Sequence, residues 1–299
     1  MLNRMLIIEI ARVTEAAAIA AARHRGHGSE IEADRAAVEA MHAALEEIAD
    51  MDGQIVVGEG AEGGAPKLFV GERLGQGAAR VDIALDPLEG ATLCAKALAD
   101  SISCVAMAEE GGLLHAPEGY MEKIAIGAGY PEGTVDLAMT AAENIARLAA
   151  AKGSDVTACI LDRPRHGDLI AEVRKAGASV RLISDGDVAG VIHAASPDET
   201  GIDIYLGTGG AAEGVLAAAA LRCLGGFMQG RLLGKRGQPA KILALTDLAS
   251  GDVMFAATGV TDGSLLKGVK FERGWIETST VVMRAATGTI RWMRNRKRV

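Results

Sequence analysis

The stretch VDIALDPLEG, residues 81–90, joins a short apolar strand to a turn that carries two carboxylates, Asp86 and Glu89. Pro87 fixes one backbone dihedral of this turn at about −65°, and Gly90 lets the backbone approach a ligand closely. Because the two acids can point the same way and repel each other, a divalent cation with oxygen ligands would relieve the repulsion. A solvated Asp-Pro turn after an ordinary strand is an equally good interpretation of this stretch alone.

Three further segments place acids in comparable positions. The apolar run 54–57 leads to Glu59 between two glycines, and the apolar run 202–206 leads through a glycine-rich turn to Glu213. Asp34 lies one turn into a helical stretch, where a carboxylate that interacts with the helix dipole is about as good a local interpretation. Since open α/β sheets bind ligands where strands end, the pattern favours a metal-dependent site for phosphoryl chemistry.

The composition is that of a globular protein with a large core. The chain has 299 residues, of which 49 % are hydrophobic and 23 % charged, enough for one large or two medium domains. Aromatic residues make up only 3 %, so the core must consist mainly of aliphatic side chains. A net charge of −8 argues against nucleic acid as a partner.

Targeting and cysteine patterns predict a cytoplasmic protein. No run approaches the ~20 apolar residues of a membrane span, so no membrane association is expected. Arg4, Glu9 and Arg12 interrupt the apolar N-terminal stretch, which therefore does not resemble a signal peptide. The four cysteines lack CxxC spacing and lie in apolar segments, as reduced thiols of the core do.

Hydrophobic periodicity predicts two differently organised halves. In the first half we expect helices over residues 9–25, 34–50 and 140–152, and strands over residues 54–57, 68–70, 81–85, 101–108 and 123–126. In the second half strands and helices alternate from residue 157 to residue 224, which predicts a parallel sheet with helices on its faces. We therefore expect an α+β domain over residues 1–153, with most of the acids, and an α/β domain over residues 154–299.

Polar turns with the chemistry of a substrate site follow these predicted strands. Arg163 and Arg165, separated by a proline, suit bidentate recognition of a phosphate, although a basic surface turn would look the same. Asp185 and Asp187 could accept hydrogen bonds from sugar hydroxyls, whereas Asp187 could equally cap a helix. Tyr120 could donate a hydrogen bond to a phosphate or be a half-buried ring.

Together these motifs resemble a known family of enzymes. The 86–90 turn is similar to the metal motif of the lithium-sensitive sugar and inositol phosphatases. The order of all the motifs resembles that of the class II fructose-1,6-bisphosphatases of the GlpX type, and the segments concerned are 12–17, 57–60, 86–90, 116–123, 163–166, 185–189 and 256–261. The resemblance implies a layered α-β-α-β-α sandwich, Mn²⁺ or Mg²⁺ as cofactor, and hydrolysis of the 1-phosphate of fructose 1,6-bisphosphate in carbohydrate metabolism.

The resemblance also implies roles for individual residues. Metal ligands are expected at five acids: Asp34, Glu59, Asp86, Glu89 and Glu213. Contacts with the sugar bisphosphate are expected at Glu89, Gly90, Ala91, Tyr120, Arg163, Pro164, Arg165, Asp185, Gly186, Asp187 and Gly210. By analogy with the family, the chain is expected to form a homodimer or homotetramer.

One departure from the family pattern falls in the catalytic turn. The family turn continues with a threonine that is thought to help activate the attacking water, and this chain has Ala91 there, with Thr92 one residue later. The expected catalytic residues are therefore Asp86, Glu89 and Thr92. Loss of one acid–base group typically costs about 10²–10⁴ in rate, so a slow phosphatase is as consistent with the sequence as a fast one.

Other departures keep two further functions open. Glu30 stands where the family has lysine, Gly63 (beside Glu62) where it has an acid, and Ala212 where it has proline, while the segment 234–249 is shorter than the family's connection. One alternative is a phosphatase for another sugar bisphosphate, such as sedoheptulose 1,7-bisphosphate. The other is a non-catalytic descendant that binds a phosphorylated metabolite.

Overall fold

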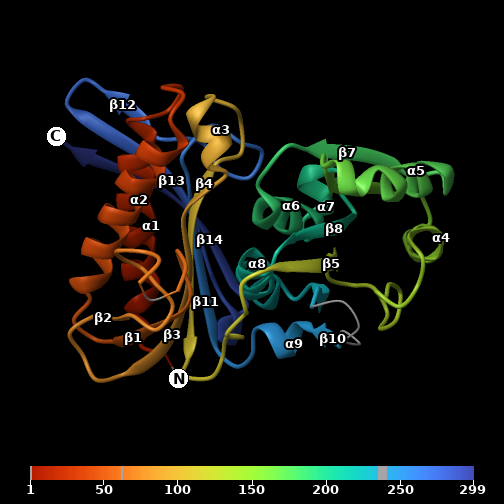
Figure 1. Cartoon of the computed structure of the whole chain (residues 1–299), viewed down its shortest axis with the longest axis horizontal. Coiled ribbons are helices and arrows are strands. Elements are labelled where there is room, and N and C mark those ends of the chain that lie inside the picture. Colours follow the sequence, from red (N-terminus) through yellow and green to blue (C-terminus); the bar gives the residue numbers. More distant parts are fainter. Residues whose placement is uncertain (1, 62, 235–240) are drawn as a thin grey trace.

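The computed structural model describes residues 2–61, 63–234 and 241–299, which form two mixed β-sheets with helices between and around them (Figure 1). Glu62 and part of the shortened connection lie outside the described residues. The helices are α1 (Leu6–Ala22), α2 (Glu30–Glu46), α3 (Ala91–Ala95), α4 (Ala141–Lys152), α5 (Gly167–Lys175), α6 (Asp187–Ala194), α7 (Pro197–Thr200), α8 (Ala211–Leu224) and α9 (Leu245–Leu248). Within the described residues, none of them has the length and apolar character to cross a membrane.

The first sheet draws its strands from both ends of the chain. Its strands are β1 (Asp52–Val57), β2 (Arg73–Leu74), β3 (Arg80–Glu89), β4 (Ile102–Glu109), β11 (Val253–Gly259), β12 (Lys270–Glu272), β13 (Trp275–Arg284) and β14 (Thr289–Arg298). They are arranged in the order β12-β13-β11-β4-β3-β1-β2, with β14 beside β13. β1 and β3 are parallel, while β3, β4, β11 and β13 are successively antiparallel.

The second sheet comes from the middle of the chain. Its strands are β5 (Tyr120–Ile126), β6 (Thr157–Leu161), β7 (Ser179–Ile183), β8 (Ile204–Gly210), β9 (Phe227–Leu232) and β10 (Ile242–Ala244), in the order β10-β9-β5-β8-β6-β7. The predicted parallel pairing holds for β6 with β7 and with β8, whereas β5 is antiparallel to both of its neighbours. The expected domain division at residue 153 therefore does not coincide with the division into sheets, and the domain boundary itself stays a prediction.

Helices and sheets alternate in five layers (Figure 1). α1 and α2 cover the outer face of the first sheet, α6 and α8 lie between the sheets, and α4 and α5 cover the outer face of the second sheet. Buried side chains form one apolar core under α1 and α2, one around α8 that reaches both sheets, and one under α4 and α5. This arrangement confirms the predicted α-β-α-β-α sandwich.

Small residues allow α8 to fit between the two sheets. Residues 217–220 are four consecutive alanines, each at most 1 % exposed. A Cβ atom at Gly214 of α8 would lie 2.6 Å from the sulfur of Met121 on β5, and one at Gly230 of β9 would lie 2.5 Å from the same sulfur. The alanine-rich, aromatic-poor composition thus has its physical reason in this middle layer, where larger side chains would push the sheets apart.

The predicted strand over residues 68–70 is wrong. Leu68 is fully buried, but its φ of +57° is incompatible with a strand. Its carbonyl accepts the N–H of Glu59 at 2.9 Å, and its own N–H donates to the carboxylate of Glu72. The apolar run therefore covers the end of β1 as a loop. The strand that does pair with β1 is the short β2, which is antiparallel to it.

We expect a larger residue in the middle of α8 to destabilise the protein. Ala219 is fully buried between the sheets, so Ala219→Leu should lower the free energy of unfolding by about 1–3 kcal/mol through overpacking. Ala146 lies exposed on α4, and Ala146→Leu should change that free energy by less than about 0.5 kcal/mol. Urea unfolding of the two variants measures the difference, and equal stabilities would contradict the argument.

Candidate active site

The turn at the end of β3 faces the middle layer of the molecule. The register between β3 and β4 shifts between Asp86 and Glu89, and Gly90, with φ +78°, precedes the first residue of α3. The carboxylate of Asp86 accepts the N–H of Leu88 within the turn at 3.0 Å. The carboxylate of Glu89 reaches α6 and accepts the N–H of Val188 at 2.9 Å. Glu89 thereby joins the first sheet to a helix that begins in the predicted sugar-binding turn.

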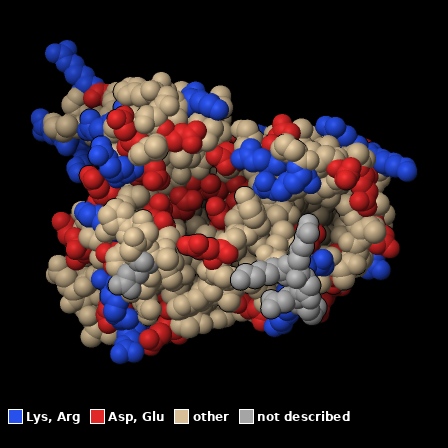
Figure 2. All heavy atoms as spheres, viewed as in Figure 1, with Lys and Arg blue, Asp and Glu red and all other residues tan. Residues whose placement is uncertain are grey.

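The other expected acids come from separate elements around this turn. They are Asp34 on α2, Glu59 directly after β1 and Glu213 in the first turn of α8. Glu213 folds back over its own helix start, because a Cβ atom at Gly210 would lie only 1.8 Å from its carboxylate. A larger residue at position 210 would force this acid out of its present orientation. Figure 2 shows acidic side chains gathered in a hollow at the centre of this face.

Burial and mutual repulsion raise the pKa values of these acids. Burial, followed by the charges of Asp34 and Glu213, raises the pKa of Glu59 to about 7. The pKa of Asp86 is raised by burial and by the charges of Glu89, Glu59 and Glu213. Burial also raises the pKa values of Asp34, Glu89 and Glu213. The predicted acids from α2, β1, β3 and α8 thus lie within range of one another's charge.

Their present arrangement is not yet a coordination shell. Among the described residues, no three His, Cys, Asp or Glu side chains lie close enough together to hold a metal ion as they stand. Asp86, Glu89 and Glu213 each accept a backbone N–H instead. Their chemistry fits a divalent cation, because hard cations take carboxylate oxygens and would neutralise the repulsion. The assignment of these acids as metal ligands stays a prediction.

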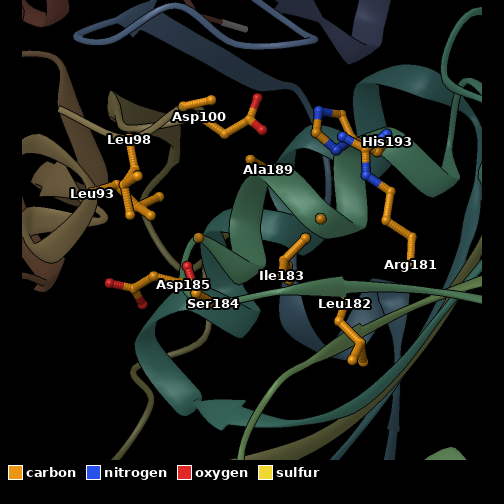
Figure 3. A pocket seen from close by; sticks show the side chains of 13 residues that line it. Leu93, Leu98, Asp100, Arg181, Leu182, Ile183, Ser184, Asp185, Ala189 and His193 are labelled. Atoms are coloured by element: carbon orange, nitrogen blue, oxygen red, sulfur yellow. The ribbon is translucent and has the colours of Figure 1, made fainter. Parts of the chain in front are cut away.

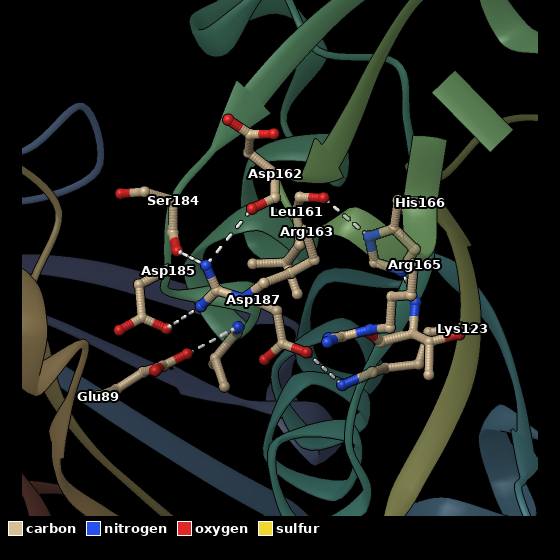
Figure 4. Close-up of polar contacts among 12 residues, drawn as sticks. Glu89, Lys123, Leu161, Asp162, Arg163, Arg165, His166, Ser184, Asp185 and Asp187 are labelled. Carbon is tan, nitrogen blue, oxygen red and sulfur yellow. Dashed lines mark hydrogen bonds and ion pairs between the residues drawn. The ribbon is translucent and has the colours of Figure 1, made fainter. Parts of the chain in front are cut away.

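The arginine turn lies beside the other predicted substrate residues (Figure 4). Arg163 donates to the carbonyl of Ser184 and lies 3.5 Å from a carboxylate oxygen of Asp185. Arg165 donates to the carbonyl of Thr208 at 2.6 and 3.1 Å, and its guanidinium lies 5.2 Å from the ring centre of Tyr120. The structure therefore brings together three predicted substrate segments from β5, β6 and β7.

His166 holds this turn in place, a role that the sequence did not reveal. Its Nδ1 lies 2.7 Å from the carbonyl oxygen of Leu161, and its Nε2 lies 2.9 Å from the N–H of Thr208. Both hydrogen bonds form only if the ring is neutral and carries its proton on Nδ1. Burial lowers the pKa of His166, and the charges of Arg165 and Arg163 lower it further. His166 belongs to the Arg-Pro-Arg-His motif, which was the only available signal.

Asp187 has a buried partner that was also missed. Gly186 is the N-cap of α6, with φ +84°, so the alternative interpretation of Asp187 as a helix cap is wrong. The Asp187 carboxylate instead forms an ion pair with Lys123 of β5. Lys123 also donates to the carbonyl of Gly210 at 2.8 Å. Two predicted substrate positions are therefore linked through one lysine.

The departures from the family pattern lie around the same region. Ala91 and Thr92 are the first two residues of α3, directly after the acidic turn. Glu30 is the first residue of α2, and its charge contributes, after that of Asp187, to the raised pKa of Asp185, for which burial is the main cause. Glu30 therefore adds negative charge where the family pattern has a lysine.

Two cavities border the acids and the substrate turns. The larger, of about 740 Å³, is mostly apolar and lies between residues 57–61, residues 116–120 and the start of α8 at residues 210–213. The smaller, of about 240 Å³, includes Asp185 and is shown in Figure 3. In its wall, His193 of α6 lies 3.0 Å from the hydroxyl of Ser264, whose N–H donates to Asp100 at 2.8 Å. These contacts tie α6 to loops of the first sheet.

A five-layer α/β sandwich that brings acids from α2, β1, β3 and α8 within range of one another's charge fits a phosphatase of the sugar-phosphate type. Residues 4–297 match the family model described as bacterial fructose-1,6-bisphosphatase, glpX-encoded. The chain belongs to this family, whose members are metal-dependent phosphatases, and the resemblance noted in the sequence is confirmed.

Two relatives illustrate the similarity. The chain is 40 % identical over 333 aligned positions to the D-fructose 1,6-bisphosphatase class 2/sedoheptulose 1,7-bisphosphatase of Synechococcus sp. strain JA-3-3Ab, with 98 % of this chain and 95 % of the relative covered. It is 40 % identical over 319 positions to the fructose-1,6-bisphosphatase 1 class 2 of Escherichia coli K12, with 97 % and 94 % covered. Both alignments are longer than the 299 residues of the chain, so these relatives carry additional residues within the matched region.

We expect the stability of the metal-free protein to fall as the pH rises. Glu59 has a pKa of about 7 in the folded protein against an ordinary value of 4.5, so the folded state binds this proton more tightly than the unfolded state. The contribution of this proton to the free energy of unfolding is therefore fully present below pH 4.5 and is lost as the pH rises through about 7. Thermal unfolding in a metal chelator, followed by circular dichroism at about pH 5.5 and about pH 8, should show a melting temperature that is lower at the higher pH.

The matched variant is Glu59→Gln, which removes the titrating group. Its melting temperature should depend less on pH than that of the unsubstituted protein. At the higher pH, Mn²⁺ should raise the melting temperature of the unsubstituted protein more than it raises that of Glu59→Gln. Identical pH dependence in the two proteins would show that Glu59 does not titrate in this range.

Proposed function

We propose that this chain hydrolyses the 1-phosphate of fructose 1,6-bisphosphate to give fructose 6-phosphate and phosphate, as an enzyme of gluconeogenesis. The observation that carries the proposal is the hydrogen bond from the N–H of Val188 to the carboxylate of Glu89. This bond joins the acidic turn of β3 to the polar turn that begins α6. A site for a reacting phosphate and a site for the rest of the sugar bisphosphate would thereby be adjacent. Membership in the family supplies the expected reaction.

The acids would hold Mg²⁺ or Mn²⁺, and the proposed ligands are Asp34, Glu59, Asp86, Glu89 and Glu213. When bound, such ions supply an activated water and neutralise charge on the phosphoryl oxygens. To reach an ion, Asp86 and Glu89 would exchange their hydrogen bonds with backbone N–H groups for metal ligation. The raised pKa values of these acids imply that binding releases protons.

The remaining side chains would bind and orient the sugar bisphosphate. Arg163 and Arg165 would hold the phosphate that does not react, and the ring of Tyr120 would position Arg165. Asp185 and Asp187 would accept hydrogen bonds from sugar hydroxyls. Gly90, Ala91, Pro164, Gly186 and Gly210 would provide backbone close to the substrate.

Proton transfer is the step that this chain is expected to perform poorly. Ala91 has no hydroxyl, and Thr92 follows it within α3. Consecutive residues of a helix point about 100° apart, so the Thr92 hydroxyl reaches the Ala91 position only if the turn shifts by one residue. We therefore propose a slow phosphatase in which Asp86, Glu89 and a shifted Thr92 act at the reacting phosphate.

Substitutions in the β3 turn should change the rate in opposite directions. Glu89→Gln keeps the size of the side chain but removes a metal-binding charge, and it should lower Mn²⁺-dependent phosphate release by at least about 10²-fold. Ala91→Thr restores the hydroxyl of the family pattern and should raise kcat by about 10-fold or more. Release is measured with fructose 1,6-bisphosphate, and Glu39→Gln, at an exposed glutamate of α2, is the control. Background-level release by both the unsubstituted protein and Ala91→Thr would favour a non-catalytic binding protein.

Removal of the Arg165 guanidinium should affect bisphosphates selectively. If Arg165 holds the second phosphate, Arg165→Ala should raise KM for fructose 1,6-bisphosphate by about 10–100-fold, because a charge-assisted hydrogen bond is lost. KM for fructose 1-phosphate, which lacks that phosphate, should stay within about threefold under the same reasoning. Arg174→Ala on the exposed side of α5 serves as the control. Equal increases in KM for both substrates would refute the assignment.

The same assay separates the two sugar bisphosphates. Sedoheptulose 1,7-bisphosphatase is part of the name of the Synechococcus relative, and the cavity of about 740 Å³ beside Glu213 has room for a longer sugar. A higher kcat/KM for sedoheptulose 1,7-bisphosphate than for the fructose compound would make it the main substrate. The expected homodimer or homotetramer can be checked by sedimentation of the same preparation.

A further inference from the structure

Lys123 is a charged side chain in the interior whose presence the proposed chemistry does not yet explain. It lies in the middle of β5, three residues after Tyr120, and is fully buried. Lysine is almost never fully buried unless its ammonium group is paired, because removal of the charge from water is costly. Its position therefore calls for a specific reason.

The ammonium group of Lys123 connects three chain segments. It forms an ion pair with Asp187 at the start of α6 and donates to the carbonyl of Gly210 at the start of α8 at 2.8 Å (Figure 4). A Cβ atom at Gly209 would lie 3.1 Å from the ammonium nitrogen and still closer to the Asp187 carboxylate. Gly209 thus leaves the space in which the lysine and the aspartate meet.

Both partners of Lys123 are positions where the sugar is expected to bind. Asp187 belongs to the turn that would accept hydrogen bonds from hydroxyls, and Gly210 is the expected backbone contact. Asp187 is itself only 6 % exposed, so its carboxylate has few alternative orientations while the ion pair holds. The charge of Lys123 also opposes the burial effect on Glu213 by lowering the pKa of that acid.

We propose that Lys123 is a positioning residue for the sugar, which fixes the Asp187 carboxylate and the Gly210 carbonyl in the arrangement that binds the fructose 6-phosphate part of the substrate. The inference rests on the proposed function and adds to it the element that sets recognition of the sugar. It assigns no step at the reacting phosphate to Lys123. Loss of the lysine should therefore weaken sugar binding while phosphate chemistry on a simpler ester continues.

A purely structural role makes a different prediction. Breaking a buried ion pair by removing one partner destabilises a protein wherever the pair lies. Lys152 provides the comparison, because it also pairs with a buried aspartate, Asp203, at 2.8 Å, although its own side chain is 31 % exposed. If Lys123 only stabilises the fold, Lys123→Met and Lys152→Met should both lower the melting temperature. Neither substitution should then change the affinity of the folded protein for its ligand.

The test measures binding of fructose 6-phosphate to the full chain in Mn²⁺ by calorimetry. Lys123→Met should weaken this binding by about 10–100-fold, the usual effect of losing hydrogen bonds to a charged group, whereas Lys152→Met should bind within about threefold of the unsubstituted protein. With fructose 1,6-bisphosphate, Lys123→Met should raise KM more than it lowers kcat. Hydrolysis of p-nitrophenyl phosphate, which has no sugar, should fall by less than the affinity for fructose 6-phosphate when Mn²⁺ is saturating, because Lys123 acts on the proposed metal ligand Glu213 only through its charge.

Two further variants keep the test decisive if Lys123→Met fails to fold. Lys123→Arg retains the charge but changes its geometry, and it should remain folded yet bind fructose 6-phosphate more weakly. The double variant Lys123→Met/Asp187→Asn leaves no unpaired buried charge, so its melting temperature should recover while its affinity stays low. A folded variant of either kind that binds fructose 6-phosphate as the unsubstituted protein does would overturn the inference. Failure of the unsubstituted protein to bind it at all would instead overturn the proposed function, and the inference with it.

Discussion

Repulsion between buried carboxylates is the constraint on which the rest of this structure depends. Glu89 is 5 % exposed and Asp86 and Glu213 are partly buried, and burial together with neighbouring carboxylates raises the pKa values of all three. The N–H of Val188 at the start of α6 donates to Glu89, and the charge of Lys123, whose ammonium group pairs with Asp187, lowers the pKa of Glu213. Both partners belong to the part of the chain that forms the second sheet and its helices, so the acidic turn of the first sheet depends on contacts with that part of the molecule.

The middle layer makes this proximity possible. α8 contacts both sheets through alanines, and glycines at residues 214 and 230 admit the side chain of Met121 between the elements. Glu213 at the start of α8 can then lie near the end of β3, which a thicker layer of aromatic side chains would prevent. The small side chains of this layer are therefore needed both for its packing and for the short separation between Glu213 and the acidic turn of β3.

Local chemistry was readable from the sequence, and contacts between distant segments were not. The turn at residues 86–90, the arginine turn and the α/β alternation all depend on neighbouring residues, and the five layers followed from the family resemblance. The strand expected at residues 68–70 was wrong because the positive φ of Leu68 is decided by its bonds to Glu59 and Glu72. The ion pair of Lys123 with Asp187 and the hydrogen bond of His166 with Thr208 join residues dozens of positions apart, which no periodicity encodes.

The origin of the first sheet at both ends of the chain has a consequence for biosynthesis. β1 to β4 leave the ribosome well before β11, which pairs with β4, and β13, which pairs with β11. Arg284 of β13 also donates to the carbonyl of Leu2. The apolar faces of α1 and α2 therefore stay partly exposed to solvent while the second sheet is being synthesised, because part of the first sheet that covers them does not yet exist. The middle of the chain can pair its own strands earlier. The first sheet, whose N-terminal strands are synthesised first, is therefore completed last.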